Sequence, residues 1–480
     1  MTASETHVVP PEARVSRRTT MAYGFGAAAY GVKDSGFGTF LLLYYNQVVG
    51  IPASTVGLVI MCALVLDAFF DLGIGVASDR TRSRWGRRHP WMYAAALPIA
   101  VGWIALWNPP DWSQTAQLVW LFATAVIVRT AVSAYEVPSQ ALTPELTADY
   151  DERTRITAYR YLFGWAGGLL MLGAAYTLFL TPTPEQPNGL LNAGGYVWFG
   201  IAGAVLMFVA ILVSAIGTHH EIERLPKVPL EKSTLGQALR ELVESVSNRA
   251  FAILMLAGLC AYTCQGISYA LSNYLYSYVW RFEGATFAIL PVSLFLGVVI
   301  SFLIAPRVAR RIGKPLTARL FIVIGAILMC SPYALRLLGA FPAYDDPIIL
   351  YVLFAIFTLQ TGFLVSVFML SASMMADVVE HSEEQTGRRS EGVFYSGAFF
   401  VQKCTSGVGI FIAGTILAFA SFPTGANPAD VPVEVIDRLT MIYIGIYLGV
   451  AVLGAWLFGR FPFGKDEHHA RVRAMAAQTD

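Results

Sequence analysis

Two aspartates, Asp67 and Asp71, stand four residues apart in a long apolar stretch. In a helix this spacing puts both carboxylates on one face, one turn apart. Two like charges at that distance repel each other unless a cation lies between them or one carboxyl holds a proton. The pair therefore predicts a site for a coupling cation, Na⁺ or H⁺. The alternative is a purely structural set of internal ion pairs.

A polar stripe follows one face of a later apolar stretch. It consists of Arg129, Ser133, Glu136 and Gln140, spaced as on one side of a helix. Of these, Arg129, Glu136 and Gln140 are candidate substrate-binding residues. Hard cations prefer oxygen ligands, so Ser133 is a candidate third ligand for the cation of Asp67 and Asp71. Arg129 fits a structural ion pair as well as it fits a functional role.

Other ionisable residues also stand inside apolar stretches. Lys33 and Asp34 are neighbours near the middle of the first stretch, Arg160 opens the fifth, and Lys403 lies in the eleventh. A charge at membrane depth is costly unless it is paired or hydrated, so each is a candidate functional residue. We expect Lys403 to be a mobile charge that changes its carboxylate partner.

The composition defines the class of protein that holds these charges. Of the 480 residues, 56% are hydrophobic and only 14% are charged, against about 25% charged in soluble proteins. The mean hydropathy is +0.56 and the pI near 7.7. These values indicate an integral membrane protein and exclude a cytosolic enzyme, a secreted disulfide scaffold and a disordered chain. A nucleic-acid partner is not expected, because no basic block occurs.

The apolar stretches predict an all-α membrane protein with twelve transmembrane helices. A crossing needs about 20 apolar residues. Twelve segments meet this length: 20–48, 54–78, 91–108, 116–143, 156–181, 195–217, 250–280, 286–306, 317–338, 347–376, 391–421 and 437–460. Lys and Arg concentrate in the tails, the central stretch and the links on one side, so we expect both termini to be cytoplasmic.

The segments divide into two halves that resemble each other. Gly86, in the Arg-rich link after the second segment, matches Gly313 in the link after the eighth. Parallel six-helix repeats are a transporter architecture with a substrate site at mid-membrane. The predicted regions are a cytoplasmic tail at 1–19, a six-helix half at 20–217, a cytoplasmic loop with a short amphipathic helix at 218–249, a second half at 250–460, and a cytoplasmic tail at 461–480.

Acidic and basic residues in the links predict a cytoplasmic gate whose ion pairs break and re-form. The alternative is that these charges only set the topology. The predicted gate residues are Asp79, Arg80, Arg87, Arg88, Asp149, Arg153, Asp377, Glu380 and Arg388.

Several motifs resemble a known family. The run from Gly75 to Arg80, closed by Gly86-Arg87-Arg88, is similar to the loop signature of the major facilitator superfamily. Four segments resemble more narrowly the glycoside–pentoside–hexuronide:cation symporters, the family of the melibiose permease: Tyr23-Gly24 to Lys33-Asp34; Asp67-Ala68-Phe69-Phe70-Asp71 with Ser83-Arg84-Trp85-Gly86; Glu136-Val137-Pro138 through Pro144; and Asp377 to Glu380 leading to Lys403.

The resemblance implies roles for the charged residues. Asp67 and Asp71 would hold the coupling cation, helped by Ser133. Sugar hydroxyls would be bound by Asp34, Glu136 and Arg160, with Lys33 close by. Lys403 would lie between the cation and the sugar.

The sequence also departs from the pattern of the melibiose permease. Phe70 replaces an asparagine near the cation, so Na⁺ and H⁺ both stay open, and Val132 and Gln140 replace a tyrosine and a tryptophan, so a galactoside is not favoured. Arg129 is an added charge. A cation facing a cavity attracts a carboxylate, which suggests a hexuronide.

The function expected from the sequence is cation-coupled symport of a sugar, glycoside or hexuronide by alternating access in the cell membrane. The expected partners are the bilayer, a small-molecule substrate and the coupling ion, with no other cofactor, and the protein is expected to act as a monomer. The chain is not expected to be an enzyme, because no HExxH, GxSxG or P-loop pattern falls in a suitable context. The alternatives are a transporter of a lysolipid or another amphipathic solute, and a membrane sugar sensor that does not transport.

Overall fold

The computed structural model describes residues 15–147, 149–225, 236, 240, 247–342, 346–386 and 391–463. Every regular element in this part of the chain is a helix. Eleven of these helices are long and apolar enough to cross a membrane. The predicted amphipathic helix of the central loop falls mostly outside the described residues.

The helices follow the apolar segments closely. The long ones are α4 (Ala53–Arg80), α5 (His89–Leu106), α6 (Gln114–Leu146), α7 (Tyr150–Ala174), α8 (Ala193–His219), α10 (Arg249–Tyr274), α11 (Ile289–Ile312), α12 (Lys314–Leu337), α13 (Ile348–Thr386), α14 (Glu391–Phe419) and α15 (Val433–Phe458). Short 3₁₀ turns are η5 (Gly189–Leu191), η6 (Ile222–Arg224) and η8 (Gly284–Ala288).

The first expected span is a chain of short helical pieces rather than one of the eleven long helices. The pieces are α1 (Arg17–Phe25), α2 (Ala28–Ser35), η2 (Gly36–Phe40), α3 (Leu41–Leu43) and η3 (Tyr44–Val48). Gly31 in α2 lies against α7 so closely that an added Cβ would stand 1.9 Å from the Gly164 carbonyl oxygen. Glycine here allows the close approach of two backbones, at the expense of helix propensity.

The chain divides into two compact units, and the division cuts through helices. The first unit comprises Met1–Phe37, Phe69–Ala175 and Ala193–Leu235, and the second comprises Gly38–Ala68, Tyr176–Asn192 and Gly236–Asp480. The boundary therefore falls inside α4, between Asp67 and Asp71. The domain limits predicted from the sequence repeat stay a prediction.

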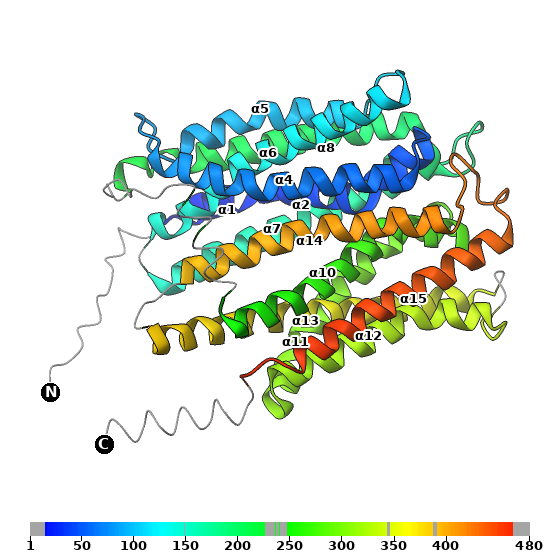
Figure 1. Cartoon of the computed structure of the whole chain (residues 1–480). Helices are drawn as coiled ribbons and strands as arrows, with labels where there is room; N and C mark the ends of the chain where they lie inside the picture. Colours follow the sequence, from blue (N-terminus) through cyan, green and yellow to red (C-terminus); the bar gives the residue numbers. More distant parts are fainter. Residues whose placement is uncertain are drawn as a thin grey trace. The chain divides into compact units, whose positions relative to one another are not determined.

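In the first unit, α5 packs on both α6 and α8, while α1 and α2 pack on α7 and α8 (Figure 1). Aromatic rings fill the space between α5 and α8. Trp107 stacks on Tyr196 with ring centroids 5.6 Å apart, and Phe199 meets Trp107 edge to face at 4.9 Å. Large buried rings of this kind contribute strongly to packing and fix the spacing of the helices.

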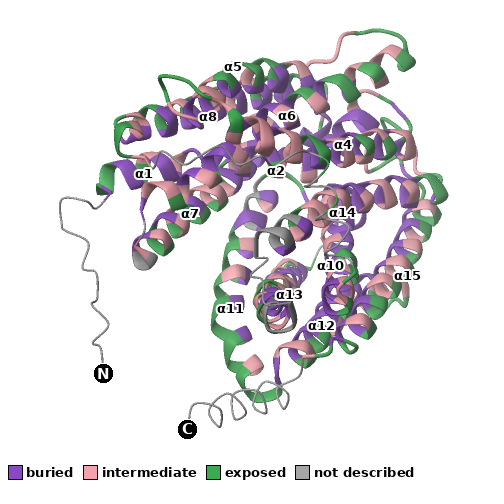
Figure 2. Ribbon diagram, turned by 60° about the vertical axis from the view of Figure 1, so that its left-hand side comes forward, coloured by how far each residue is buried: buried purple, intermediate pink, exposed green. Residues whose placement is uncertain are grey.

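In the second unit, α13 packs against α11 and α12, and α10 packs against α14 and α15 (Figure 2). Along α11, exposed apolar side chains include Phe295, Phe302 and Leu303. A water-soluble protein rarely exposes such a continuous apolar face, whereas a membrane-spanning helix turns it toward lipid.

The two matched glycines both have a positive φ. Gly86 has φ +73° and Gly313 has φ +86°, a region that L side chains rarely adopt. Each is followed directly by a basic residue, Arg87 and Lys314. Both matched positions therefore require a backbone conformation that favours glycine.

Candidate functional site

One buried ionic contact in the first unit joins α6 to α7. Arg160 donates through Nη2 to Glu136 Oε1 at 2.8 Å, and Gln140 donates to the same oxygen at 2.9 Å. The side chains of Arg160 and Glu136 are only 9% and 16% exposed. A carboxylate beside a guanidinium offers both acceptors and donors, which is what a polyhydroxylated ligand needs. The structure thus brings together three of the predicted substrate residues.

A second group of contacts holds the Arg160 guanidinium in place. Its Nη1 donates to Ser139 Oγ at 2.6 Å, and its centre lies 5.0 Å from the ring centroid of Tyr23 on α1. The Tyr23 hydroxyl in turn donates to the Ser139 carbonyl and lies 2.7 Å from Thr143 Oγ1. The sequence did not reveal Ser139 as part of the site. Its signal is the spacing of three residues from Glu136, which puts both on one face of α6.

Lys33 and Asp34 form a contact of their own on α2. Lys33 Nζ lies 3.5 Å from Asp34 Oδ1 and 4.1 Å from the ring centroid of Tyr30. The lysine side chain is 4% exposed and the aspartate side chain 56% exposed. Of these two predicted substrate residues, Asp34 is therefore the accessible one, and Lys33 is buried beside it.

Arg129 and Ser133 are both buried on α6, above Glu136 in the same stripe. The Arg129 guanidinium lies 5.3 Å from the ring centroid of Phe37, a cation–π distance. The stripe is thus a real feature of α6: it runs from buried Arg129 and Ser133 through half-buried Glu136 to exposed Gln140.

In the second unit, Lys403 on α14 pairs with Asp67 on α4. Lys403 Nζ donates to Asp67 Oδ2 at 3.1 Å. The side chain of Asp67 is 2% exposed and that of Lys403 23% exposed. Asp67 is thus the carboxylate partner of Lys403 in this structure; whether Lys403 changes its partner stays a prediction. Asp71 follows one turn later on α4, on the other side of the boundary between the units.

The Arg-rich link after α4 forms an ion-pair cluster in the first unit. Arg88 lies 2.5 Å from Asp79 Oδ1 and donates to Ser78 Oγ at 3.0 Å. Arg87 and Arg88 each reach Glu145 Oε1 at 2.9 Å. Glu145, near the end of α6, was not expected from the sequence. The sequence shows only an acidic residue directly after Pro144, at the polar end of an apolar stretch.

Asp149 and Arg153 have a local role at the link from α6 to α7. Asp149 Oδ1 accepts from the Glu152 backbone N–H at 2.7 Å, which caps the start of α7. Arg153 donates to the Thr147 carbonyl at 2.8 Å, near the last turn of α6. These contacts tie the two helix ends together. Arg80, the last residue of α4, is exposed.

The second unit has its own version of the link cluster. Lys314, the first residue of α12, lies 2.7 and 2.8 Å from the two carboxylate oxygens of Asp377 on α13. The sequence analysis named Asp377 but not its partner Lys314. Glu380 is exposed, one turn further along α13. Arg388 lies outside the described residues.

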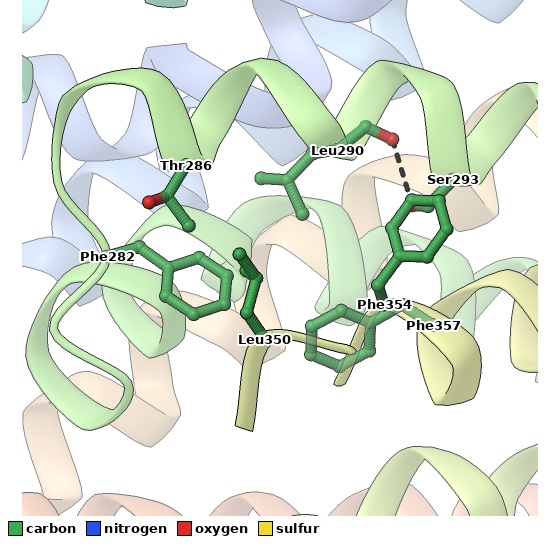
Figure 3. Close-up of a pocket in the computed structure, with 7 residues that line it drawn as sticks. All are labelled: Phe282, Thr286, Leu290, Ser293, Leu350, Phe354 and Phe357. Atoms are coloured by element: carbon green, nitrogen blue, oxygen red, sulfur yellow. Dashed lines mark hydrogen bonds between the residues drawn. The ribbon is translucent and has the colours of Figure 1, made fainter. Parts of the chain in front are cut away.

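A small pocket in the second unit has a different character (Figure 3). It is lined by Phe282, Thr286, Leu290, Ser293, Leu350, Phe354 and Phe357. The pocket has two side-chain hydroxyls, those of Thr286 and Ser293. Ser293 Oγ already donates to the Leu290 carbonyl at 2.9 Å. The rest of the lining is apolar and it contains no ionisable residue, so the pocket is a poor fit for a sugar.

Comparisons with known proteins show that the chain is similar to sugar-transport proteins. A family model described as MFS/sugar transport protein matches residues 22–465. A glucuronide carrier protein homolog from Escherichia coli is 27% identical, with 89% of each chain covered. An isoprimeverose transporter from Lactiplantibacillus pentosus is 26% identical, covering 88% of this chain and 84% of that protein. The solved xylose transporter XylE from E. coli has a TM-score of 0.59 at 14% identity, covering 93% and 96% of the two chains.

Proposed function

Since the chain belongs to the MFS/sugar transport protein family, we propose that it is a symporter of a sugar, glycoside or hexuronide, driven by Na⁺ or H⁺. It is a multi-pass protein of the cell membrane, and its relatives are transporters rather than enzymes. In this proposal the first helical pieces form a twelfth crossing, both termini are cytoplasmic, and a single chain carries out alternating access.

The observation that carries the substrate class is the Glu136–Arg160 pair with its fixed geometry. Glu136 Oε1 accepts from two donors, and Arg160 is held by Ser139 and the Tyr23 ring. A positioned carboxylate and guanidinium can bind adjacent hydroxyls of one sugar ring without reorganising. The names of the glucuronide carrier homolog and the isoprimeverose transporter support the same class.

We propose that the coupling ion binds at Asp67, and the sequence predicts Asp71 and Ser133 as its further ligands. The pairing of Asp67 with Lys403 supports this assignment, because the lysine occupies the carboxylate as a replaceable cation. Na⁺, or a proton on the carboxyl, would displace the ammonium. Coupling then arises because the ion and the substrate favour the same conformational state.

Arg129 is proposed to favour a substrate with a carboxylate, so a hexuronide is preferred over a neutral sugar. An Arg129→Ala variant is expected to lose uptake of an acidic sugar and to keep uptake of a neutral one. Full uptake of the acidic sugar by this variant would contradict the assignment.

The experiment that tests the substrate class is a thermal-shift screen of the purified protein. Neutral sugars, glycosides, hexuronides and lysolipids are each added with and without Na⁺, at two pH values. A sugar or uronide that raises the unfolding temperature, and more so with Na⁺ or at the lower pH, is the expected result. Stabilisation by lysolipids alone would favour an amphipathic substrate. Binding of a sugar in the screen without uptake into proteoliposomes would indicate a sensor.

A further inference from the structure

Two arginines and a tryptophan gather at one end of the second unit, where α12 packs against α15 (Figure 1). They are Arg319 near the start of α12, Trp456 in the last turn of α15, and Arg460 just beyond that turn. All three side chains are exposed. None of them takes part in the ionic contacts described above, so their role is open.

Both guanidiniums lie against the end of α15. The centre of the Arg460 guanidinium lies 4.1 Å from the ring centroid of Trp456, a cation–π distance. A Cβ added at Gly459 would stand 3.2 Å from Arg319 Nη1 and 3.4 Å from the Trp456 carbonyl oxygen. Glycine at position 459 therefore leaves room for the Arg319 side chain to reach across from α12. The two arginines form one cationic site at a single helix end.

This site has no acidic partner in the part of the chain that the structure describes. Neither guanidinium makes an ion pair or a hydrogen bond with a described residue. Other basic side chains at the same end of the unit are bound, since Arg310 donates to the Pro306 carbonyl and Lys314 pairs with Asp377. A charge beside a membrane-spanning helix is costly unless an anion or water meets it. The two arginines are therefore available to an anion from outside the chain.

An apolar surface continues from the arginines along both helices. Its exposed side chains are Leu316, Leu320, Ile324 and Ile327 on α12, and Val452 and Leu453 on α15. Both helices are long and apolar enough to cross a membrane, so this surface faces lipid acyl chains. A phosphate next to acyl chains is the arrangement of a phospholipid. A soluble phosphate would have no apolar part to place on this surface.

The position of Arg319 is not explained by the internal repeat or by topology. In the register that matches Gly86 to Gly313, Arg319 corresponds to Met92, which is completely buried. A basic residue in the links would be enough to set the orientation in the membrane. Arg319 stands instead more than one turn inside α12. It is thus a feature of the second unit that needs its own reason.

We propose that Arg319, Arg460 and Trp456 bind the phosphate of an anionic membrane phospholipid, whose acyl chains lie along α12 and α15. Guanidiniums bind phosphate through strong, charge-assisted hydrogen bonds. Tryptophan is enriched at the level of lipid headgroups, and the Trp456 ring also holds the Arg460 guanidinium in place. Two cationic side chains favour an anionic lipid over phosphatidylcholine, because choline adds a third cation. The site shares no residue with the proposed sugar and ion sites.

Native mass spectrometry of the full-length protein in a neutral detergent tests this site. Phosphatidylglycerol is titrated into the unmodified protein, Arg319→Gln, Arg460→Gln and the double variant, and the dissociation constant of the first bound lipid is compared. The matched control is Arg310→Gln. It removes another exposed arginine from the same end of the second unit, where the guanidinium already donates to the Pro306 carbonyl.

Each single variant should weaken the first phosphatidylglycerol about five-fold, which is the contribution of one basic residue at an anionic membrane surface. The double variant should weaken it more than either single variant, and Arg310→Gln should leave it unchanged. Unchanged binding in both single variants would overturn the proposal. Equal weakening in Arg310→Gln would also overturn it, because the lipid would then follow net charge rather than this site. If Arg319→Gln does not fold, Arg460→Gln alone decides the matter.

Two further probes identify the part of the lipid that is recognised. Phosphatidylcholine has the acyl chains and the phosphate but adds a cation, and glycerol phosphate has the phosphate without the chains. Both should bind more weakly than phosphatidylglycerol. Equal binding of phosphatidylcholine would contradict the preference for an anionic lipid, and equal binding of glycerol phosphate would make this a site for soluble phosphates. Neither sugar nor coupling ion is present, so failure of this site is distinguishable from failure of the proposed transport.

Discussion

Arg160 and Lys403 each pair with a carboxylate inside the helical part of the chain, but the two contacts are built differently. The planar Arg160 guanidinium donates to Glu136 and Ser139 and packs on Tyr23. Lys403 presents a single flexible ammonium to Asp67 at 3.1 Å. Arginine suits a fixed multi-point contact, whereas lysine is a point charge on a mobile stem. The comparison indicates a contact fixed at several points in the first unit, where we propose substrate binding, and a single-point ionic contact in the second.

The largest effect is expected from deleting the fixed contact. Arg160→Ala leaves Glu136 without its guanidinium, and removing one partner of a buried pair costs about 3–5 kcal/mol. Chemical unfolding should show this loss, and sugar binding should fall below detection. The control Arg224→Ala removes a 67% exposed side chain that lies 3.5 Å from Glu221, where a pair contributes about 0–1 kcal/mol. Equal losses of stability in Arg160→Ala and Arg224→Ala would contradict the view that the buried pair contributes more than the exposed one.

Exchanging the two cation types tests the comparison directly. Arg160→Lys keeps the charge but loses the fork, so substrate affinity should drop about ten- to a hundred-fold, as expected when buried partners are left unsatisfied. Lys403→Arg should change substrate affinity little and slow ion-driven uptake instead. Isothermal titration and uptake kinetics separate the two effects. If Lys403→Arg weakened binding as much as Arg160→Lys, the two contacts would not differ as described.

A smaller effect, on hydrogen exchange, is expected at the ion pairs of the links. Here too the first unit uses arginine and the second uses lysine. Glu145 accepts from two arginines, whereas Asp377 accepts from Lys314 alone among the contacts described above. Glu145→Gln should speed hydrogen exchange in the 81–88 link about ten-fold, since contacts with charged groups are the stronger hydrogen bonds. Asp377→Asn should change exchange near 313–316 less. The reverse order would contradict the ranking.

The smallest effect is expected from Tyr23→Phe. The hydroxyl joins α1 to α6 through the Ser139 carbonyl, and one neutral hydrogen bond contributes about 0.5–1.5 kcal/mol. The ring that packs against Arg160 remains. Stability should therefore fall slightly while sugar affinity stays within about three-fold, a change of well under 1.4 kcal/mol. A loss of binding as large as in Arg160→Lys would mean that the hydroxyl itself contacts substrate.

The sequence predicted the long helices well because each needs only a continuous apolar run. Gly86 and Gly313 were matched by their basic links, and both have the positive φ that favours glycine. The partners Glu145 and Lys314 were not predictable, since their pairing depends on which helix ends meet in space. Ser139 was missed for a similar reason: a serine in an apolar helix has many ordinary uses. The π-helical segments η2 and η3 also escaped prediction, because five residues are too few to distinguish their period from that of an α-helix.

The proposed coupling-ion site at Asp67, which pairs with Lys403, can be tested in proteoliposomes. Asp67→Asn removes the negative charge that is proposed to bind the coupling ion, and it keeps the shape of the side chain. We expect this variant to exchange sugar across the membrane at equal concentrations but to lose uphill accumulation under an Na⁺ or H⁺ gradient. The exposed Asp111→Asn serves as the control and should accumulate sugar normally. Normal concentrative uptake by Asp67→Asn would contradict the account.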